Sequence, residues 1–209
     1  MIFVSYYTAE GSYPALAHKL RASLERFGLR ADIEERKPLG NWADGCRFKS
    51  QFILGMVLKH RQSVVWMDVD TEVRQYPEML FGPHDFAIYN WIADDDHHLT
   101  GRILHDPAAT TLLCSGGVQK WGYTAPAIEL LVRWISKLEA GDWTQGDDPW
   151  LDAAFNEARP PVNALWLPKA YNCMADHSVH WARVPASTIV IHHDNQPGPG
   201  SRQRHRPEA

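Results

Sequence analysis

Two carboxylates follow a short apolar run about a third of the way along the chain. The stretch VVWMDVDTEV, residues 64–73, places Asp68 and Asp70 directly after four apolar residues. Side chains two positions apart on an extended chain point the same way, so these carboxylates can converge. Mg²⁺ and Mn²⁺ prefer oxygen ligands of this kind, often completed by phosphate, so the pair indicates a divalent-metal site. A DxD alone also fits a simpler interpretation, in which both acids cap the following turn or pair with Arg74.

The apolar patterning around this pair predicts alternating strands and helices. A first helix, with leucines at helical spacing from Leu16, is expected to end at Gly28. Strands are expected over residues 2–7, 31–35, 64–67 and 85–89, and a second helix over 46–60 after a loop at 37–45. This order favours a mainly parallel sheet covered by helices. In such a sheet Asp68 and Asp70 lie at the carboxyl edge, where ligands bind.

The second half of the chain is less regular. It predicts a polar loop at 94–101, a strand broken by glycines at 110–118, an amphipathic helix at 125–138, a shorter helix from Pro149, and strands at 162–168 and 188–193. We therefore expect one α/β domain, a mixed and mainly parallel sheet flanked by helices, over residues 1–196. Residues 197–209 form a Pro-, Gly- and Arg-rich C-terminal tail.

Composition narrows the class of protein. The net charge of −4 gives no general electrostatic case for binding nucleic acid, and the basic run is confined to the tail, at Arg202, Arg204 and Arg206. Three widely spaced cysteines without a CxxC pair favour a reducing compartment. No stretch approaches the roughly 18 apolar residues of a membrane span, and the start lacks a signal pattern. We expect a cytoplasmic protein without membrane association or an obligate protein partner.

A haloacid-dehalogenase-type phosphatase is one alternative for the acidic pair. Such enzymes also carry DxD after an apolar strand, with the first Asp as the phosphorylated nucleophile. Their pattern places Thr or Val two residues after the second Asp, where this chain has Glu72, and the threonine comes one residue early, at Thr71. The motif also follows a complete βαβ unit, whereas theirs stands near the start of the domain. These departures disfavour the phosphatase.

Six segments spread along the chain resemble GT-A-type nucleotide-diphospho-sugar glycosyltransferases, in the right order. They are the first strand with Tyr6, Tyr7 and Thr8, LGNWADGCRFKSQFIL (39–54), VVWMDVDTEV, CSGGVQKW (114–121), GDDPWLDAAF (146–155) and TIVIHHDNQ (188–196). The match spans about residues 2–195, which makes it far more specific than the DxD alone. It departs from the family where Asp148 replaces the commoner Gln or Glu, and where a Gly-x-x-Lys segment is missing after the late histidine.

The resemblance implies a GT-A, Rossmann-like fold and a metal-dependent transfer of sugar from a nucleotide-diphosphate sugar, with a UDP-sugar favoured, to an acceptor hydroxyl. It implies Mn²⁺ or Mg²⁺ held by Asp68, Asp70 and His192, with Asp70 as a direct ligand. Asp147 and Asp148 are the candidate catalytic residues, Asp147 first. The residues implied in binding the nucleotide sugar are Tyr6, Tyr7, Thr8, Arg47, Lys49, Asp68, Ser115, Gly116 and Gly117.

Several of these residues also have a plain structural explanation. His192 and His193 are adjacent, so only one of them can face a site on one side of a strand, and we favour His192. Lys49 can simply be exposed on its helix. The two glycines can form a turn or bulge, and one of the two acids at 147–148 can cap the helix that follows. His97 and His98, beside three aspartates, are best explained by a solvated polar loop.

The acceptor is left open by the sequence. A small metabolite, a protein, a polysaccharide precursor or a hydroxymethylated base in phage-type DNA would each supply a hydroxyl. Nine tryptophans and the basic tail are compatible with DNA, whereas the net charge weighs against it. A third hypothesis is a non-catalytic nucleotide-sugar-binding protein on the same fold.

Overall fold

The first part of the chain forms the parallel half of the main sheet. The computed structural model describes residues 1–40, 42–93, 106–141, 146–158, 162–174 and 186–193. Strand β1 (Ile2–Thr8) is followed by helix α1 (Tyr13–Glu25), strand β2 (Ala31–Arg36), helix α2 (Trp42–His60) and strand β3 (Val64–Met67). Gly28, with φ of +65°, ends the α1 region as predicted.

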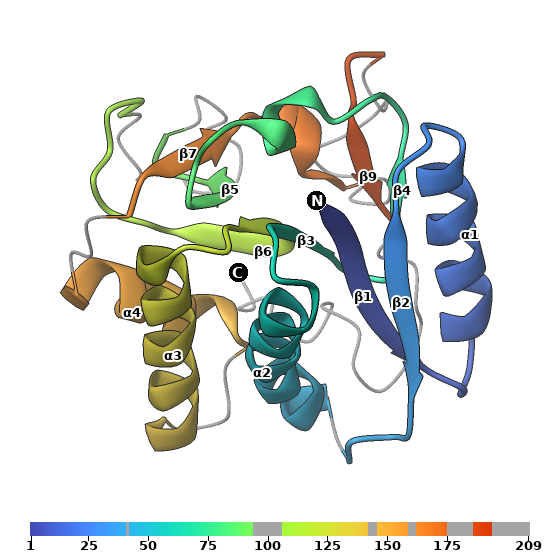
Figure 1. The fold of residues 1–209 in the computed structure, drawn as a ribbon, viewed down its shortest axis with the longest axis horizontal. Coiled ribbons are helices and arrows are strands. Elements are labelled where there is room, and N and C mark those ends of the chain that lie inside the picture. Colours follow the sequence, from blue (N-terminus) through green and yellow to red (C-terminus); the bar gives the residue numbers. More distant parts are fainter. Residues whose placement is uncertain (41, 94–105, 142–145, 159–161, 175–185, 194–209) are drawn as a thin grey trace, which may run out of the picture.

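The remaining elements complete one six-stranded sheet and a small second sheet. They are β4 (Thr71–Val73), a 3₁₀ turn η1 (Glu78–Phe81), β5 (Phe86–Asn90), β6 (Cys114–Trp121), α3 (Ala125–Ala140), α4 (Asp148–Ala158), β7 (Ala164–Leu167), a 3₁₀ turn η3 (Lys169–Tyr171), β8 (Cys173–Met174) and β9 (Val190–His192). The main sheet has the order β2-β1-β3-β6-β5-β7 (Figure 1). Strand β6 is antiparallel to both neighbours, whereas the other paired strands run parallel. The predicted mixed, mainly parallel α/β sheet in a single domain is confirmed.

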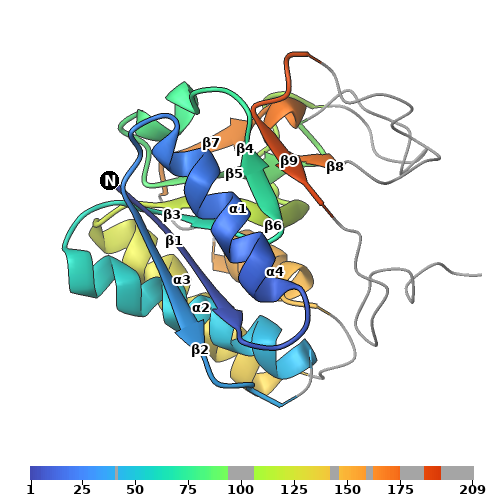
Figure 2. The same cartoon turned by 90° about the vertical axis from the view of Figure 1, so that its right-hand side faces the viewer.

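The small sheet brings distant parts of the chain together. Its order is β4-β9-β8, with β4 antiparallel and β8 parallel to the central β9 (Figure 2). Strand β4 begins one residue after Asp70. The sheet therefore joins the segment that follows the acidic pair to the late strand that carries His192.

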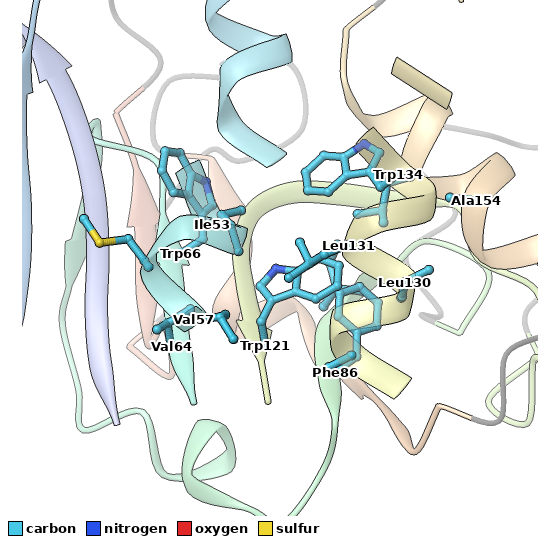
Figure 3. Packing of buried hydrophobic residues seen from close by; sticks show 14 of the residues in the cluster. Ile53, Val57, Val64, Trp66, Phe86, Trp121, Leu130, Leu131, Trp134 and Ala154 are labelled. Carbon is cyan, nitrogen blue, oxygen red and sulfur yellow. The ribbon is translucent and has the colours of Figure 1, made fainter. Parts of the chain in front are cut away.

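Helices cover the main sheet on both faces. The largest apolar cluster packs α2, α3 and α4 against β1, β3, β5 and β6, and a second cluster packs α1 and the small sheet against the other face (Figures 1 and 2). Figure 3 shows Trp121 of β6 at the centre of the larger cluster. Its ring stacks on Trp134 of α3 at 6.0 Å and lies 4.5 Å from the ring of Phe86. This packing fixes α2 and α4, the helices that position the site.

The structure corrects three sequence-based expectations. Strand β6 begins at Cys114 rather than residue 110, and it runs unbroken through both glycines to Trp121. Its pairing with β5 shifts between Ile88 and Tyr89, so the glycines occupy an irregular stretch of a continuous strand. Helix α2 starts at Trp42 instead of residue 46, after a turn at Gly40 with φ of +105°. Strands β4 and β8 were not expected.

Other expectations fall outside the described residues. They include the polar loop with His97 and His98, and the tail over 197–209 with its three arginines. Among the helices that are described, none combines the length and the apolar character needed to cross a membrane.

Candidate active site

Asp68 is held in a defined position at the end of β3. Its backbone N–H donates to the carbonyl of Gly117 at 2.9 Å, which continues the pairing of β3 with β6 beyond Met67. The indole N–H of Trp66 donates to Asp68 Oδ1 at 2.8 Å. The Thr71 backbone N–H and hydroxyl both donate to the Asp68 carbonyl, at 3.0 and 2.7 Å. These bonds shape the turn that carries Asp70, so the DxD geometry is set by the fold.

The pairing of β4 with β9 places His192 beside the two aspartates. Thr71 lies opposite His192 in this pair, and the His193 N–H donates to the Asp70 carbonyl at 2.8 Å. Ligand atoms of Asp68, Asp70 and His192 all lie within 4.8 Å of one another, with His192 buried. Two carboxylate oxygens and one imidazole nitrogen form a donor set that fits Mn²⁺ or Mg²⁺.

His193 occupies a different environment, as the alternation along a strand requires. Its Nε2 lies 3.0 Å from Glu72 Oε2 and 3.1 Å from Lys19 Nζ. Burial raises the pKa of Glu72, but the hydrogen bond from His193 and the charges of Arg74 and Lys19 outweigh it, so the pKa is lowered overall. Thus His192 joins the acidic pair, and His193 belongs to a neighbouring ion-pair cluster.

Lys49 lies among carboxylates rather than on an exposed helix face. Its Nζ is 3.2 Å from Asp68 Oδ1 and 3.0 Å from Asp147 Oδ2, and the residue is 7% exposed. Burial favours the neutral amine, yet the charges of Asp147, Asp68 and Asp148 together hold the pKa of Lys49 well above its usual value. The lysine is therefore a buried cation that bridges the DxD motif and the start of α4.

Both glycines of β6 make room for side chains of the site. A Cβ on Gly117 would lie 2.1 Å from Cε1 of His192. A Cβ on Gly116 would lie 2.3 Å from Asp148 Oδ1 and 3.3 Å from Lys49 Nζ. Contacts of 2.1 and 2.3 Å are essentially never seen for real Cβ atoms, so a larger residue at either position would displace His192 or Asp148. The glycines thus serve the close approach of protein side chains, one on each face of the strand.

Tyr6 packs in an aromatic cluster between β1 and α2. Its ring lies 5.1 to 5.4 Å from the rings of Phe48, Phe52 and Trp66, and its hydroxyl donates to the Gly45 carbonyl at 2.7 Å. Burial raises the pKa of this hydroxyl. In this position the ring fixes the first turns of α2, the helix that carries Lys49.

Three other residues expected to bind the nucleotide, Tyr7, Thr8 and Arg47, lie on the same two elements, β1 and α2, but their side chains have different surroundings. Tyr7 points away from Tyr6, and its hydroxyl donates to Glu35 Oε2 at 3.2 Å. Thr8 is half-buried at the end of β1, at the same edge of the sheet as the end of β3. Arg47 is also half-buried and precedes Lys49 by two residues, so the two side chains leave α2 in different directions.

A row of polar side chains spaced four residues apart attaches helix α4 to the start of β6 and to the residues just before it. Asn156 accepts a hydrogen bond from the Leu112 N–H at 2.7 Å and donates to its carbonyl at 2.8 Å. Asp152 accepts from the Cys114 N–H at 2.9 Å. The third member, Asp148, lies against Gly116. This row sets the distance of Asp147 and Asp148 from the glycines, and it was not foreseen from the sequence.

Asp152 gives a testable pH dependence. Burial raises its pKa to about 6, although hydrogen bonds from Cys114 lower it. Because the folded state disfavours the ionised carboxylate, its contribution to stability should be complete below pH 4 and lost as the pH rises through 6. In Asp152→Asn, the fall in the free energy of unfolding over this pH range should be smaller by up to about 3 kcal/mol. Urea denaturation between pH 4 and 7.5 measures it. Asp32 is the control. Burial raises the pKa of Asp32, but hydrogen bonds from Lys59 and His60 outweigh burial and lower the pKa overall, so Asp32→Asn should change the pH dependence of stability with the opposite sign.

Three residues near the site were not singled out from the sequence. Trp66 is one of four apolar residues of β3, yet its indole N–H bonds the first aspartate. Burial and the charges of Asp70 and Cys46 raise the pKa of Tyr13, which places this tyrosine near the acidic pair. Burial and the charge of Asp147 raise the pKa of Cys46. Trp66 is a sequence neighbour of Asp68, whereas only the tertiary structure brings Tyr13 and Cys46 near the aspartates.

Comparisons with known proteins agree with this fold. No model of a known protein family matches the chain, and no curated protein matches its sequence. Among solved structures, the chain is similar to that of a glycosyltransferase involved in the glycosylation of the major capsid of PBCV-1. The TM-score is 0.62, the sequences are 15% identical, and the match covers 91% of this chain and 92% of that one. This similarity over nearly the whole of both chains establishes the shared fold.

Proposed function

We propose that the protein is a metal-dependent glycosyltransferase that moves a sugar from a nucleotide-diphosphate sugar, most simply a UDP-sugar, to an acceptor hydroxyl. The observation that carries this proposal is the convergence of Asp68, Asp70 and His192 with the buried Lys49 at the carboxyl edge of the sheet. A fold shared with a solved glycosyltransferase supports it. We assign the metal site to Mn²⁺ or Mg²⁺.

The charge balance of the site suits a nucleotide diphosphate only when a metal is bound. Asp68, Asp147 and Asp148 set three carboxylates around the Lys49 ammonium, and Asp70 lies beside Asp68. Together these four acids would repel a diphosphate. A divalent cation held by Asp68, Asp70 and His192 would supply positive charge to stabilise the diphosphate leaving group. Lys49, adjacent to Asp68, is positioned to face the same negative charge.

The contacts suggest separate roles for the two acids at the start of α4. Asp147 is buried and holds the Lys49 ammonium at 3.0 Å. Asp148 is less buried and lies against Gly116. We assign Asp147 to positioning the lysine. We assign Asp148 to the sugar hydroxyls or to the proton of the acceptor hydroxyl.

Binding of nucleotide and metal tests the proposal. We expect a UDP-sugar with Mn²⁺ to raise the melting temperature by about 5–10 °C at 100 times its Kd, and far less without metal. UDP, GDP and their sugars should be compared with and without Mn²⁺. Asp70→Asn should abolish the metal-dependent part. Glu72→Gln, in the neighbouring cluster with His193, is the matched control and should retain it.

Two results would contradict the proposal. The first is that no nucleotide or nucleotide sugar stabilises the protein in a metal-dependent way. The second is hydrolysis of a generic phosphate ester that is lost in Asp68→Asn, which would indicate a phosphatase. Binding without sugar transfer to any hydroxyl acceptor would favour the non-catalytic alternative.

The acceptor is proposed by class. Any hydroxyl that reaches the carboxyl edge beside Asp148 would meet the requirement, including one on a protein-linked glycan or on a hydroxymethylated DNA base. The solved glycosyltransferase of similar fold takes part in glycosylating a viral capsid protein. Mass spectrometry of protein and DNA from cells that express the chain, with and without hydroxymethylated bases, distinguishes these acceptors.

A further inference from the structure

Asn172 carries a buried amide whose hydrogen-bonding capacity is only half used. It directly precedes β8 and is 2% exposed. Its Oδ1 accepts a hydrogen bond from the Ser115 hydroxyl at 3.1 Å. Its Nδ2 is buried and has no hydrogen-bond partner within the described part of the chain. Exchanging the two amide atoms would place Nδ2 on Ser115 and leave Oδ1 unmet instead. In either orientation, one polar atom of this amide therefore lacks a partner among the described residues.

An unmet polar group at this depth is costly. Leaving a buried donor or acceptor without a partner destabilises the folded protein, and native structures contain few such groups. Moreover, the bond to Ser115 fixes the orientation of the amide, so its remaining group points in a defined direction. A group that is oriented, buried and unmet is suited to receive a polar atom from a bound ligand.

The amide lies on the same face of β6 as the metal-binding candidates. Gly116 of this strand faces Asp148, whereas Gly117 faces His192. Side chains alternate along a strand, so Ser115 shares the face of Gly117. The small sheet agrees, because Cys173, which follows Asn172, pairs with Ile191, the neighbour of His192. The Asn172 amide therefore contacts β6 at Ser115, two positions before Gly117, the residue that faces the His192 imidazole.

Ser115 also lies at the ligand edge of the sheet. Strand β6 runs antiparallel to β3 and β5, so its first residues lie where those strands end. Ser115 pairs with Tyr89, the penultimate residue of β5, and Gly117 bonds to Asp68 just past the end of β3. A sugar attached to a diphosphate at the metal site would have to lie near this edge.

We propose that Asn172, oriented by Ser115, hydrogen-bonds a hydroxyl of the transferred sugar and thereby selects the donor. This inference rests on the proposed function. The diphosphate sits at the metal-binding residues, and the sugar extends along β6 toward Ser115. A hydroxyl of the right configuration meets the unmet amide group. An epimer or a deoxy analogue leaves that group buried without a partner, and binding is weaker for this reason.

The test separates sugar recognition from nucleotide binding. Titration calorimetry with Mn²⁺ would compare UDP with UDP-glucose, UDP-galactose and UDP-N-acetylglucosamine, first for the wild-type chain. The gain in affinity from UDP to the preferred UDP-sugar is the quantity of interest. Asn172→Ala should lower this gain at least tenfold and leave UDP binding within about twofold. Asn172→Asp should do the same, because it keeps an oxygen facing Ser115 and replaces the amide donor by an acceptor. Ser115→Ala should reduce the gain and flatten the preference among sugars.

A control variant, and separate outcomes for the inference and for the proposed function, complete the test. Asn163, exposed before the start of β7 and bonded to Asp85, is the control: Asn163→Ala should bind every ligand as the wild type does. An unchanged gain in Asn172→Ala and Ser115→Ala would overturn the inference, as would a wild-type chain that binds all three UDP-sugars equally. If both Asn172 variants fail to fold, an unchanged preference in Ser115→Ala overturns it. Absence of metal-dependent UDP binding by the wild type would instead overturn the proposed function.

Discussion

Lys49→Met should lower the free energy of unfolding by about 3–5 kcal/mol at neutral pH. The lysine is 7% exposed and forms ion pairs with Asp68 and Asp147, so its removal leaves buried carboxylates without a counter-charge. Its raised pKa keeps it charged throughout the neutral range, and the stability it contributes is lost only when the pH rises through that pKa. Urea denaturation at pH 7 measures the loss, and metal-dependent nucleotide binding should weaken in the same variant.

Lys59 provides the control on the same helix. Its side chain is 51% exposed and pairs with Asp32 and Glu34 at the surface. Surface pairs contribute little, so Lys59→Met should change stability by at most about 1 kcal/mol and leave nucleotide binding intact. Equal losses in the two lysine variants would show that the buried ion pairs do not stabilise the site.

Gly117→Ala should disrupt the proposed metal-binding cluster of Asp68, Asp70 and His192 while leaving the rest of the fold in place. The added methyl group would lie 2.1 Å from Cε1 and 2.8 Å from Nδ1 of His192, so the imidazole has to leave its present position beside Asp68 and Asp70. We expect metal-dependent nucleotide binding to be lost and stability to fall by about 1–3 kcal/mol, as in other overpacked cores. Calorimetry with Mn²⁺ and UDP, together with urea denaturation, gives both quantities.

Two further variants test whether the effect of Gly117→Ala comes from its contact with His192. Gly55→Ala, in α2 where a Cβ meets nothing within 4 Å, should leave nucleotide binding intact and stabilise slightly. Removing the imidazole as well, in Gly117→Ala with His192→Ala, should recover stability relative to Gly117→Ala without restoring metal-dependent binding. Full metal-dependent binding by Gly117→Ala alone would show that His192 is not needed.

Most of the main sheet was predictable because its signals are local. Runs rich in apolar residues placed β1 and β3, and the helical spacing of leucines placed α1, within a few residues of their observed bounds. The short segment ADIEE placed β2. The end of β3 also placed Asp68 and Asp70 at the carboxyl edge. Strands β4 and β8, by contrast, have only three and two residues. Such short segments are strands only because β9 pairs with them, and no local pattern indicates that.

The sequence identified several residues of the site, but it could not show which side chains they contact. Lys49 and the two glycines were singled out, yet the sequence could not show that the lysine is buried between two acidic segments. Nor could it show that each glycine accommodates a side chain of the protein itself. These features depend on how α2, α4 and β9 approach β6, which is decided by packing among residues far apart in the chain. Asn172 and Asp152 carried no local signal for the same reason.

The pairing of β4 with β9 affects the order in which parts of the protein can fold during translation. Asp68 and Asp70 leave the ribosome about 120 positions before His192. Until then the nascent chain holds an acidic pair without its imidazole, and β4 has no strand to pair with. The main sheet can assemble from earlier segments, but the cluster that we propose binds metal comes together only when β9 adds to the small sheet. The proposed metal site is therefore completed late, by a strand of three residues.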